Sequence, residues 1–585
     1  MRQTTLQQAD INMQHRVFNA MIKEHIFNEG TRITKQNHRL EVQYQGKVLS
    51  VSINGVYAFE RYQMQGPLEL QEGDKQQTIA SLEQLIDTLE QDFEVAFPTR
   101  LKQELIHSRR GFDLTYAQME KRNQLIQDSM KFSRMPVSLN YFAWMSHMNA
   151  LGEMDDLLYS ESLVVEGHPT HPLSKTKLPL TNEEVMRYAP EFEQIIPLKV
   201  MLLRKEDAVT TSASSDPDFI LNEVLKDDKA QLKDYAKALG YDIDDFEIVI
   251  IHPWQYEHVI VEQFKTWIQE QRLIPTPITL KSKATLSFRT MALLERPYHI
   301  KLPVQVQATS AIRTVSSVTT VDGPKLSYEL QDMLNVYPQL KVAREPFGLH
   351  AAIEPDQARQ LAYIVRERPM IDGEGVTVVT ASLVNQNPVD DMKVVDSYLE
   401  WVDREISAQS IKHFMTVYAH TLIPPLIAYI QEYGIALEAH MQNTIVKLGK
   451  DYKMGFMVRD LGGSRIDLET MKEKIPNVKV ENESLIAEDI EAVIAKFQHA
   501  VIQNQMGELI YHLSQHEDVT EQELFTIVQE ITRHAIDPNK PHATVLNQIL
   551  FGTTITVKSL LRMRMEGKVK KYVNTILDNP LKEGE

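Results

Sequence analysis

The chain has 585 residues, 43% of them hydrophobic and none of them cysteine, and its formal net charge is −18 at pH 7. This length predicts roughly three or four domains. The acidic balance and the lack of a long Lys/Arg block argue against a general affinity for nucleic acid or anionic membranes. Without cysteine there are no disulfides, thiolate metal sites or cysteine nucleophiles, which fits a cytoplasmic protein. No apolar run has the length of a signal peptide or a membrane span.

The first 150 residues are predicted to form an α+β unit that scaffolds or covers a site located elsewhere. Apolar residues recur at helical spacing in three stretches, and one stretch alternates in a strand-like way around a turn at Gln45-Gly46. The predicted helices are residues 12–27, 77–97 and 118–132, and the predicted hairpin is residues 39–57.

A stiff polar loop follows, containing Gly167-His168-Pro169-Thr170-His171-Pro172. Its two prolines fix φ and push the preceding histidines toward extended conformations. Together with Ser174, Lys175 and Lys177, the loop offers the donors needed to hold phosphate oxygens, which indicates a nucleotide. The alternative is a histidine-containing turn with a solvated basic end.

Between this loop and residue 284 the pattern alternates between helix, loop and strand. Residues 182–189 are predicted to be helical and to stop at Pro190, and residues 207–218 are predicted to be an exposed loop. Residues 246–251 form an apolar strand that ends in His252-Pro253-Trp254-Gln255, a frequent position for ligand contacts. The alternative is that His252 and Trp254 only fill the sheet edge.

A cationic hairpin is predicted next, with strands at 284–294 and 298–308. Period two places Ser287 and Arg289 on one face and Thr290 on the other. The partner strand and its end supply four more polar side chains: Lys301, Thr309, Ser310 and Arg313. This is the local positive charge that an anionic ligand needs in so acidic a protein, although a surface hairpin with solvated cations also explains the charge.

A domain boundary is predicted near residues 341–348, which divides the chain into 1–150, 151–345 and 346–585. A helix over 404–433, kinked at Pro424-Pro425, is expected to end at Gly434. Residues 435–446 are then predicted to be a strand with three polar side chains on one face, Glu438, His440 and Gln442.

The chain is expected to turn back at residues 448–451 toward Asp460. Glu438, Asn443 and Asp460 then form a plausible oxygen-ligand set for Mg²⁺, whereas the alternative is an ordinary polar hairpin. The remaining chain is predicted to be amphipathic helix at 486–514, 521–535 and 549–564, and one cation of its last segment, which contains Lys558, is expected to point into the cleft.

Three predicted features together fit nucleotide-dependent activation of a carboxylic acid. They are a loop that binds phosphate, a carboxylate pair that binds Mg²⁺, and a basic pocket. Phosphoryl transfer is the weaker interpretation, because no Asp precedes Asn443 as a catalytic base and no Gly-rich loop follows an N-terminal strand. Adenylation needs only alignment and charge neutralisation, which clustered Arg, Lys, His and Mg²⁺ provide. A non-catalytic metabolite-binding protein using the same pocket remains the alternative.

These segments resemble, in order and spacing, the signatures of the aerobactin-synthetase-like siderophore synthetases that work without nonribosomal peptide synthetases. The resemblance implies an α+β fold with thumb, fingers and palm subdomains in a cupped hand, a distantly kinase-like C-terminal subdomain, and a homodimer. It also implies that ATP and Mg²⁺ convert an acid to an acyl-adenylate, from which an amine or hydroxyl displaces AMP.

By matched position, the resemblance implies three sets of site residues. Those for ATP are His171, Lys175, Ser287, Arg289, Thr290, Lys301, Gln442 and Asn443. Those for the carboxylate substrate are Thr309, Ser310, Arg313, His440 and Lys558, and those for Mg²⁺ are Glu438 and Asp460. Among them His440, Arg313, Lys301 and Arg289 are expected to take part in catalysis.

Two departures from the family pattern concern the loop and the acid. Lys177 and Leu178 stand where many members have arginine and glycine, and Ser310 stands where some citrate-using members have asparagine. The second departure favours 2-oxoglutarate or a citrate derivative over free citrate. The general likeness is to a staphyloferrin-type enzyme, with the staphyloferrin B type as the specific expectation.

Overall fold

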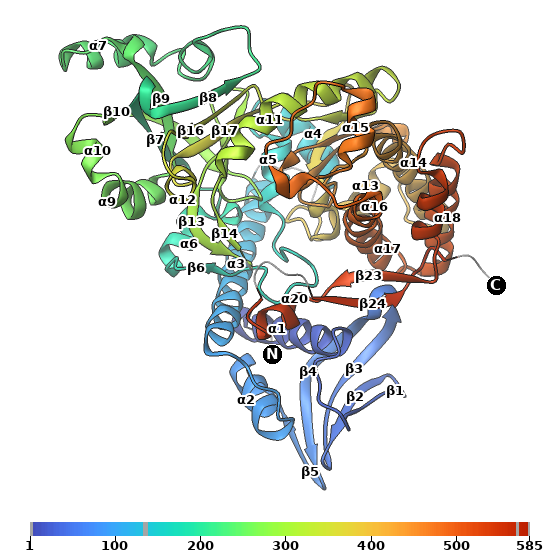
Figure 1. Ribbon diagram of the computed structural model, residues 1–585. Coiled ribbons are helices and arrows are strands. Elements are labelled where there is room, and N and C mark those ends of the chain that lie inside the picture. The colour runs from blue at the N-terminus through green and yellow to red at the C-terminus, as the bar shows by residue number, and fades with distance from the viewer. Residues whose placement is uncertain (1–3, 133–138, 310, 569–572, 583–585) are drawn as a thin grey trace.

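The structure is a computed structural model, and it describes residues 4–132, 139–309, 311–568 and 573–582. Three bodies of secondary structure surround a central region: an N-terminal sheet with its helices, a large central sheet, and a C-terminal set of helices around a smaller sheet (Figure 1). Ser310, one of the predicted substrate residues, lies outside the described residues.

The N-terminal body is a five-stranded antiparallel meander, β1 to β5 in chain order, backed by helices. Helix α1 begins at a capping box in which Thr4 and Gln7 satisfy each other's backbone N–H groups. The predicted hairpin is confirmed, since Tyr44 pairs with Lys47 across the turn at Gln45-Gly46. The elements are α1 (Thr5–Lys23), β1 (Arg32–Gln36), β2 (Arg39–Tyr44), β3 (Lys47–Tyr57), β4 (Arg61–Glu72), β5 (Lys75–Thr78), α2 (Leu82–Asp92) and α3 (Thr99–Phe132).

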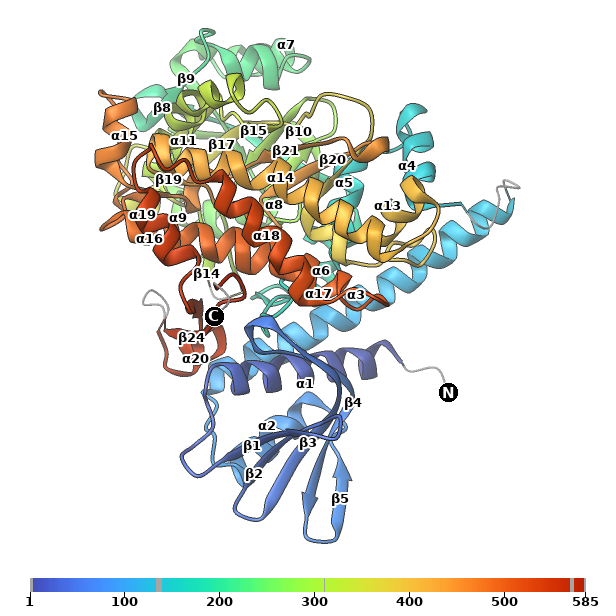
Figure 2. The ribbon, with the colours of Figure 1, turned by 90° about the vertical axis from the view of Figure 1, so that its right-hand side faces the viewer.

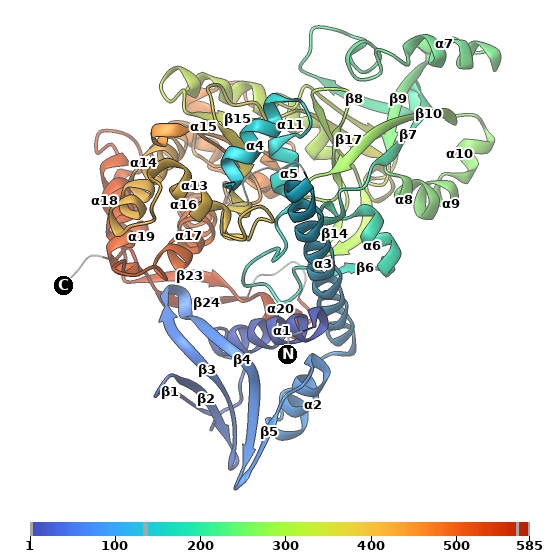
Figure 3. The ribbon, with the colours of Figure 1, turned by 180° about the vertical axis from the view of Figure 1, so that it is seen from behind.

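Helix α3 leaves the N-terminal body and runs up into the rest of the molecule, as the view from behind shows (Figure 3). Its length of 34 residues corresponds to about 50 Å at 1.5 Å per residue, so one rigid element links two bodies. Two shorter helices follow, α4 (Tyr141–Ala150) and α5 (Asp156–Ser162), and both pack on C-terminal elements.

The central body is an eight-stranded sheet in the order β8-β16-β17-β12-β11-β10-β7-β9. The apolar strand predicted at 246–251 is confirmed as β9, and its residues are almost fully buried. The elements are β6 (Lys177–Leu178), α6 (Asn182–Tyr188), β7 (Ile196–Arg204), β8 (Ala208–Ser212), α7 (Lys229–Ala238), β9 (Phe246–Ile251), β10 (Leu273–Ala284), β11 (Thr290–Leu293), β12 (Tyr298–Lys301), β13 (Val304–Ala308), β14 (Ala311–Arg313), α11 (Ser317–Glu329), β16 (Phe347–Ala351) and β17 (Ala362–Glu367).

One expectation for this region was wrong. Residues 208–212, expected in a loop, form the edge strand β8, which pairs with β16. An edge strand of polar residues carries a weak local signal, and only its tertiary pairing defines it. Strands β16 and β17 continue the same sheet past residue 345, where the sequence predicted a domain boundary.

The C-terminal body packs helices against a four-stranded sheet in the order β15-β21-β20-β18. The predicted long helix is confirmed as α14, which ends at Gly434 with a left-handed φ of 62°. The elements are β15 (Leu340–Val342), β18 (Val376–Val379), α13 (Val394–Asp403), α14 (Ala408–Tyr433), β19 (Ile435–Ala436), β20 (Thr444–Leu448), β21 (Met454–Val458), α15 (Leu468–Lys474), α16 (Ile490–Phe497), α17 (Gly507–Leu513), α18 (Glu521–Ala535), α19 (Ala543–Leu550), β23 (Thr554–Lys558), α20 (Leu560–Met565) and β24 (Asn574–Asp578).

The tip of the β3–β4 hairpin docks the N-terminal body on these helices, and Figure 2 shows the two bodies stacked. Arg61 forms an ion pair with Glu508 of α17, and its guanidinium lies 3.5 Å from the centre of the Tyr511 ring. The backbone N–H of Ala58 donates to the carboxylate of Glu521. From the other side, Leu561 of α20 is buried in the N-terminal core, so both chain ends contribute to this contact. Within the part of the chain that is described, no helix is both long and apolar enough to cross a membrane.

A buried ion pair fixes the end of β21 to helix α5. Arg459 donates two hydrogen bonds, of 2.7 and 3.0 Å, to the carboxylate of Glu161, and both side chains are at most 3% exposed. The same guanidinium donates to the carbonyl of Gln442 at 3.0 Å. The pair therefore positions the turn that carries Asp460.

We expect Glu161→Gln to destabilise the protein by about 3–5 kcal/mol, because it leaves the Arg459 cation buried without a compensating charge. Urea unfolding followed by circular dichroism measures the change. The control is Glu295→Gln, which breaks an ion pair to Lys281 whose side chains are 62% and 63% exposed, and which should cost no more than about 1 kcal/mol. Equal effects of the two substitutions would contradict the anchoring role of Glu161.

Candidate active site

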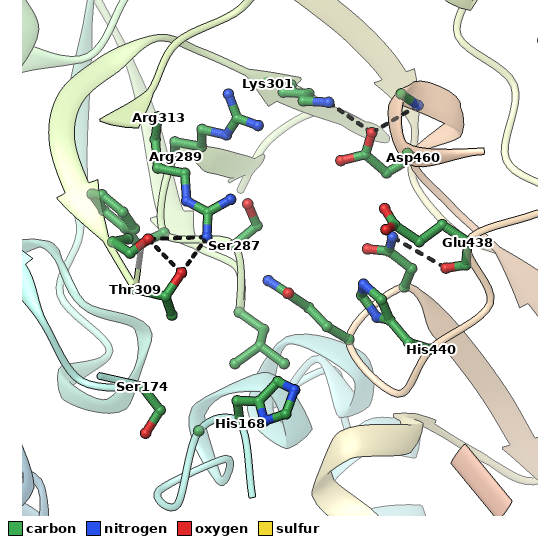
Figure 4. Close-up of a pocket in the computed structure, with 18 of the residues that line it drawn as sticks. His168, Ser174, Ser287, Arg289, Lys301, Thr309, Arg313, Glu438, His440 and Asp460 are labelled. Atoms are coloured by element: carbon green, nitrogen blue, oxygen red, sulfur yellow. Dashed lines mark hydrogen bonds and ion pairs between the residues drawn. The ribbon is translucent and has the colours of Figure 1, made fainter. Parts of the chain in front are cut away.

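A cavity of about 730 Å³ lies where the central and C-terminal bodies meet the histidine-containing loop. Its walls are built from loops and strand ends of both bodies, with cations on one side and carboxylates on the other (Figure 4). The predicted site residues that line it are His171, Lys175, Ser287, Arg289, Lys301, Thr309, Arg313, Glu438, His440, Gln442, Asn443 and Asp460.

Three basic side chains form the cationic wall. Lys301 is the last residue of β12, and Arg313 ends β14. Arg289 and Ser287 lie in the loop between β10 and β11 and not in a strand, which corrects the predicted hairpin. The main reason is that β10 ends at Ala284 and the chain re-enters the sheet only at Thr290, where it pairs with Lys301.

Hydrogen bonds aim two of these guanidinium groups. Arg289 donates through NH1 to the carbonyl of Thr314, and its buried Nε has no hydrogen-bond partner among the described residues. Arg313 donates to Thr309 Oγ1 at 3.0 Å and to the carbonyl of Ala308 at 3.2 Å. Burial and the neighbouring Arg313 lower the pKa of Arg289 to about 10, so the group is still a cation at neutral pH and gains from an anion beside it.

The acidic wall comes from two turns of the C-terminal body. Asp460 has a left-handed φ of 70° and caps the short turn Leu461–Gly463, accepting from the N–H of Gly462. Glu438 lies in the turn between β19 and β20, where Asn443 Nδ2 donates to its carbonyl at 3.3 Å. The long strand predicted over 435–446 is therefore wrong: only residues 435–436 and 444–448 are extended, because the chain must turn to bring Glu438 and Asn443 together.

The two walls meet at a buried ion pair. Lys301 Nζ lies 2.7 Å from Asp460 Oδ1, and Arg366 NH2 lies 3.7 Å from the same oxygen. These cations, with Arg289, hold the pKa of Asp460 well below its usual range against the opposing effect of burial. Asp460 is therefore ionised, and the predicted facing of the two hairpin regions across one cavity is confirmed.

The carboxylate pair fits a magnesium ion by the chemistry of its ligand atoms. Glu438 and Asp460 offer the oxygen ligands that Mg²⁺ prefers. Each is already paired with a cation, Glu438 with Lys496 and Asp460 with Lys301, and Lys496 keeps the pKa of Glu438 low. A methyl group on Gly463 would lie 1.7 Å from Glu438 Oε2, so the chain passes directly against the carboxylate.

The histidine loop supplies a directed donor. His171 Nδ1 accepts from the N–H of Leu173 at 3.1 Å, so the proton of the neutral ring is on Nε2. That Nε2 is buried without a hydrogen-bond partner in the described part of the chain. A ligand oxygen in the cavity would satisfy it.

Other predicted residues have different surroundings. Lys175 forms a buried ion pair with Glu191 and donates to the carbonyl of Val164 at 3.2 Å, so its ammonium is already compensated. Thr290 and Lys558 are not among the residues that line the cavity, although Lys558 is close enough to lower the pKa of Lys496. Trp254 NE1 donates to Glu184 and His252 caps a short helix, so both contribute to the local fold.

Sequence reasoning missed several cavity residues, among them Arg359, His499 and Asn504. The last two lie on a segment of π-helix, residues 498–506, which interrupts a long amphipathic helix. Helical periodicity indicated that helix but gives no signal for a π segment or for which of its polar residues face a cavity.

The chain is similar to known proteins in sequence and in fold. Residues 156–385 match the IucA/IucC family, and residues 412–573 match the family described as ferric iron reductase FhuF-like transporter. The staphyloferrin A synthase of Staphylococcus aureus (strain NCTC 8325 / PS 47) is 55% identical over 98% of both chains. The chain belongs to the IucA/IucC family of siderophore synthetases. It is a ligase.

Two further similarities place this siderophore synthetase within the family. The D-ornithine–citrate ligase of the same S. aureus strain is 28% identical over 93% of this chain and 87% of its own. The ATP-bound aerobactin synthetase of a hypervirulent Klebsiella pneumoniae has the same fold, with a TM-score of 0.80 at 18% identity over 98% of this chain and 100% of its own. The predicted α+β cupped-hand architecture is thereby confirmed.

The expected similarity to a staphyloferrin B synthase is weaker than the similarity to the staphyloferrin A synthase. The S. aureus staphyloferrin B synthase is 22% identical over 64% of this chain and 66% of its own, against 55% for the staphyloferrin A synthase. Ser310, on which the preference for 2-oxoglutarate or a citrate derivative depended, lies outside the described residues.

We expect Gly463→Ala in this synthetase to lower product formation about 100-fold, because the added methyl group displaces the Glu438 carboxylate by about 1 Å or more. The matched control is Gly462→Ala, where the nearest atom to the added methyl group lies at an ordinary 3.4 Å. Both are measured as turnover under the same saturating conditions. Comparable activity of the two variants would contradict the placement of Glu438.

We also expect stability to fall as the pH drops below about 6.5. Burial lowers the pKa of His171 and His252 from 6.5 to about 3. Between these values the unfolded chain binds protons that the folded chain does not, so each group costs about 1.4 kcal/mol per pH unit.

Urea titrations at several pH values between 5 and 7.5 measure this slope. His252→Asn keeps the acceptor for the Trp254 N–H and removes one titrating group. The slope of its free energy of unfolding against pH should therefore be smaller by about 1.4 kcal/mol per pH unit. An unchanged slope would contradict the buried neutral state of His252.

Proposed function

We propose that this synthetase uses ATP and Mg²⁺ to adenylate a carboxylic acid and then condenses the acyl group with an amine or hydroxyl, releasing AMP and pyrophosphate. The observation that carries the proposal is the opposition of Arg289, Lys301 and Arg313 to Glu438 and Asp460 across one cavity. A polyanion with a divalent cation neutralises both walls at once, which neither a simple acid nor a simple amine does.

We assign one half of the cationic wall to the nucleotide and the adjacent half to the acid substrate. Arg289 and Lys301, with the Nε2–H of His171 and the hydroxyl of Ser287, are placed to hold phosphate oxygens. Gln442 and Asn443 come from the opposite wall and complete the proposed nucleotide site. Lys175 is already paired with Glu191, and the contact of Thr290 with ATP stays a prediction. The name of the ATP-bound aerobactin synthetase, which shares this fold, supports nucleotide use.

Arg313 and Thr309 are assigned to the acid substrate, with His440 on the facing turn. The guanidinium of Arg313 offers a planar fork that matches a carboxylate. The names of two relatives, staphyloferrin A synthase and D-ornithine–citrate ligase, favour citrate or a citrate conjugate over 2-oxoglutarate as the acid. They also favour an amine over an alcohol as the nucleophile. Lys558, Ser310, the homodimer and the cytoplasmic location stay predictions.

Catalysis in this proposal is mainly positioning and charge stabilisation. Bound magnesium supplies positive charge that offsets the phosphates, and Glu438 and Asp460 hold it. The protein's own task is to align the acid carboxylate with the α-phosphate, which Arg313 does from the end of β14 and Arg289 from the loop between β10 and β11. Buried Lys301 then stabilises the charge that develops on the leaving pyrophosphate.

The direct test is the identity of the nucleotide product. The enzyme incubated with ATP, magnesium, citrate and an amine panel should release AMP and pyrophosphate in equal amounts, measured by chromatography and a coupled pyrophosphate assay. ADP with a phosphorylated acceptor would show a kinase instead, and no hydroxamate with hydroxylamine and any acid would show a binding protein.

Arg289→Ala and Arg313→Ala should fail in different parameters. Each removes charge-assisted hydrogen bonds worth about 1.5–3 kcal/mol, so kcat/KM should fall about 10- to 100-fold. For Arg289→Ala the loss should appear in the KM for ATP, and for Arg313→Ala mainly in the KM for the acid. Steady-state kinetics with each substrate varied measures both, and unchanged KM values in both variants would contradict the assignment of this wall.

A further inference from the structure

One wall of the cavity is a π-helix that sequence reasoning did not single out. The helix that begins at Ile490 continues to Leu513, and residues 498–506 in its middle have π geometry. Such segments are rare and occur frequently at functional sites. The wider turn places Asn504 beside His499, five residues earlier, and Asn504 Nδ2 donates to the carbonyl of His499 at 2.6 Å. Both side chains line the cavity.

The hydrogen bonds of His499 define its tautomer. Its Nδ1 lies 2.7 Å from Gln503 Oε1, an oxygen that can only accept, so Nδ1 carries the proton. Its Nε2 therefore carries a lone pair. Asn504 Nδ2 lies 3.4 Å from this Nε2 and 3.5 Å from Nδ1, so the amide lies beside the ring and makes no short hydrogen bond to either nitrogen. An N–H group of a ligand can make a shorter hydrogen bond to Nε2.

The surroundings keep this imidazole neutral. Lys496 from the same helix, Lys558 from β23, and His440 and His168 from the facing loops are the titratable groups around it. Burial is the main cause that lowers the pKa of His499 to about 3, and Lys558 and Lys496 add to it. Glu438, the nearby carboxylate, is paired with Lys496.

The proposed reaction needs such an acceptor. A primary alkylamine has a pKa near that of lysine, about 10.4, so at neutral pH it is an ammonium ion without a lone pair. It attacks the acyl carbon only after losing one proton, and the nitrogen must lose a second proton when the C–N bond forms. The acid and nucleotide sides of the cavity carry Arg289, Lys301 and Arg313, which donate and cannot accept.

We propose that His499 is the catalytic residue that accepts the proton of the attacking amine through Nε2, with Asn504 orienting the amine beside it. In the step, the ammonium ion first loses one proton to solvent. The amine nitrogen then forms a C–N bond to the acyl carbon, the C–O bond to the AMP phosphate breaks, and AMP leaves with that electron pair. The second proton passes from the nitrogen to Nε2 and then to solvent.

This inference rests on the proposed adenylation. The observations favour His499 over His440. Hydrogen bonds to the His499 ring define which of its nitrogens accepts a proton. The hydrogen bonds described for His440 involve only its backbone N–H and carbonyl. His440 stays on the acid side in this scheme.

The test separates the two half-reactions in the full-length enzyme. His499→Gln should leave acid-dependent ATP–pyrophosphate exchange within about threefold of the parent, because that step uses the other wall. Amide formation with an alkylamine should fall about 100-fold or more, in the range of lost general base catalysis. Hydroxylamine is a weaker base than an alkylamine, so the nitrogen loses its proton to water readily once the C–N bond forms, and hydroxamate should still form at nearly the parent rate.

Two further variants keep the result interpretable. Gln503→Glu retains an acceptor for Nδ1–H and adds negative charge, so the acidic limb of the amide-formation pH profile should move to higher pH. His534→Gln, on an exposed position of α18, should change none of these rates.

The outcomes distinguish the two proposals. If the parent enzyme shows no acid-dependent exchange, the adenylation proposal fails. If exchange is normal and His499→Gln still forms the amide within about threefold of the parent, or loses the amide and hydroxamate reactions equally, the role of His499 is overturned.

Discussion

The ion pair between Lys301 and Asp460 is the interaction on which the rest of the site depends. It joins the end of a central-sheet strand to a turn of the C-terminal body, and both groups are largely buried. Charges so far from water are tolerated only when they are paired, and here Arg366 and Glu345 extend the pair into a network. The network fixes the distance between the two walls of the cavity before any ligand binds.

This arrangement also resolves the conflict between the protein's charge and its proposed ligands. A net charge of −18 repels nucleotides and citrate-like acids at long range. Within the cavity, however, three cations of one wall lie in a partly buried region where the local field dominates and salt screens little. Anionic ligands are therefore attracted only inside the cavity, where the acid and the phosphates must meet. This confinement favours selective binding over tight binding.

The long elements give the site its rigidity and the irregular ones give it its chemistry. Helix α3, helix α14 and the eight-stranded sheet carry the packing, yet the cavity residues come from loops, short turns and one π segment. Asp460 in a left-handed conformation and Gly463 against the Glu438 carboxylate show how tightly these turns are constrained. Ion pairs such as Glu161 with Arg459 hold the turns to the helices.

The sequence by itself determined the family likeness, the cationic and acidic segments, and the elements with strong local signals. Gly434 ends helix α14 and Gln45-Gly46 turns the first hairpin because glycine suits a left-handed cap and a tight turn. The tertiary structure alone decided that residues 437–443 form a turn, that β8, β16 and β17 complete the central sheet, and that His499 faces the cavity. These features arise from contacts between segments far apart in the chain, and local periodicity cannot encode which polar residue a distant surface will bury.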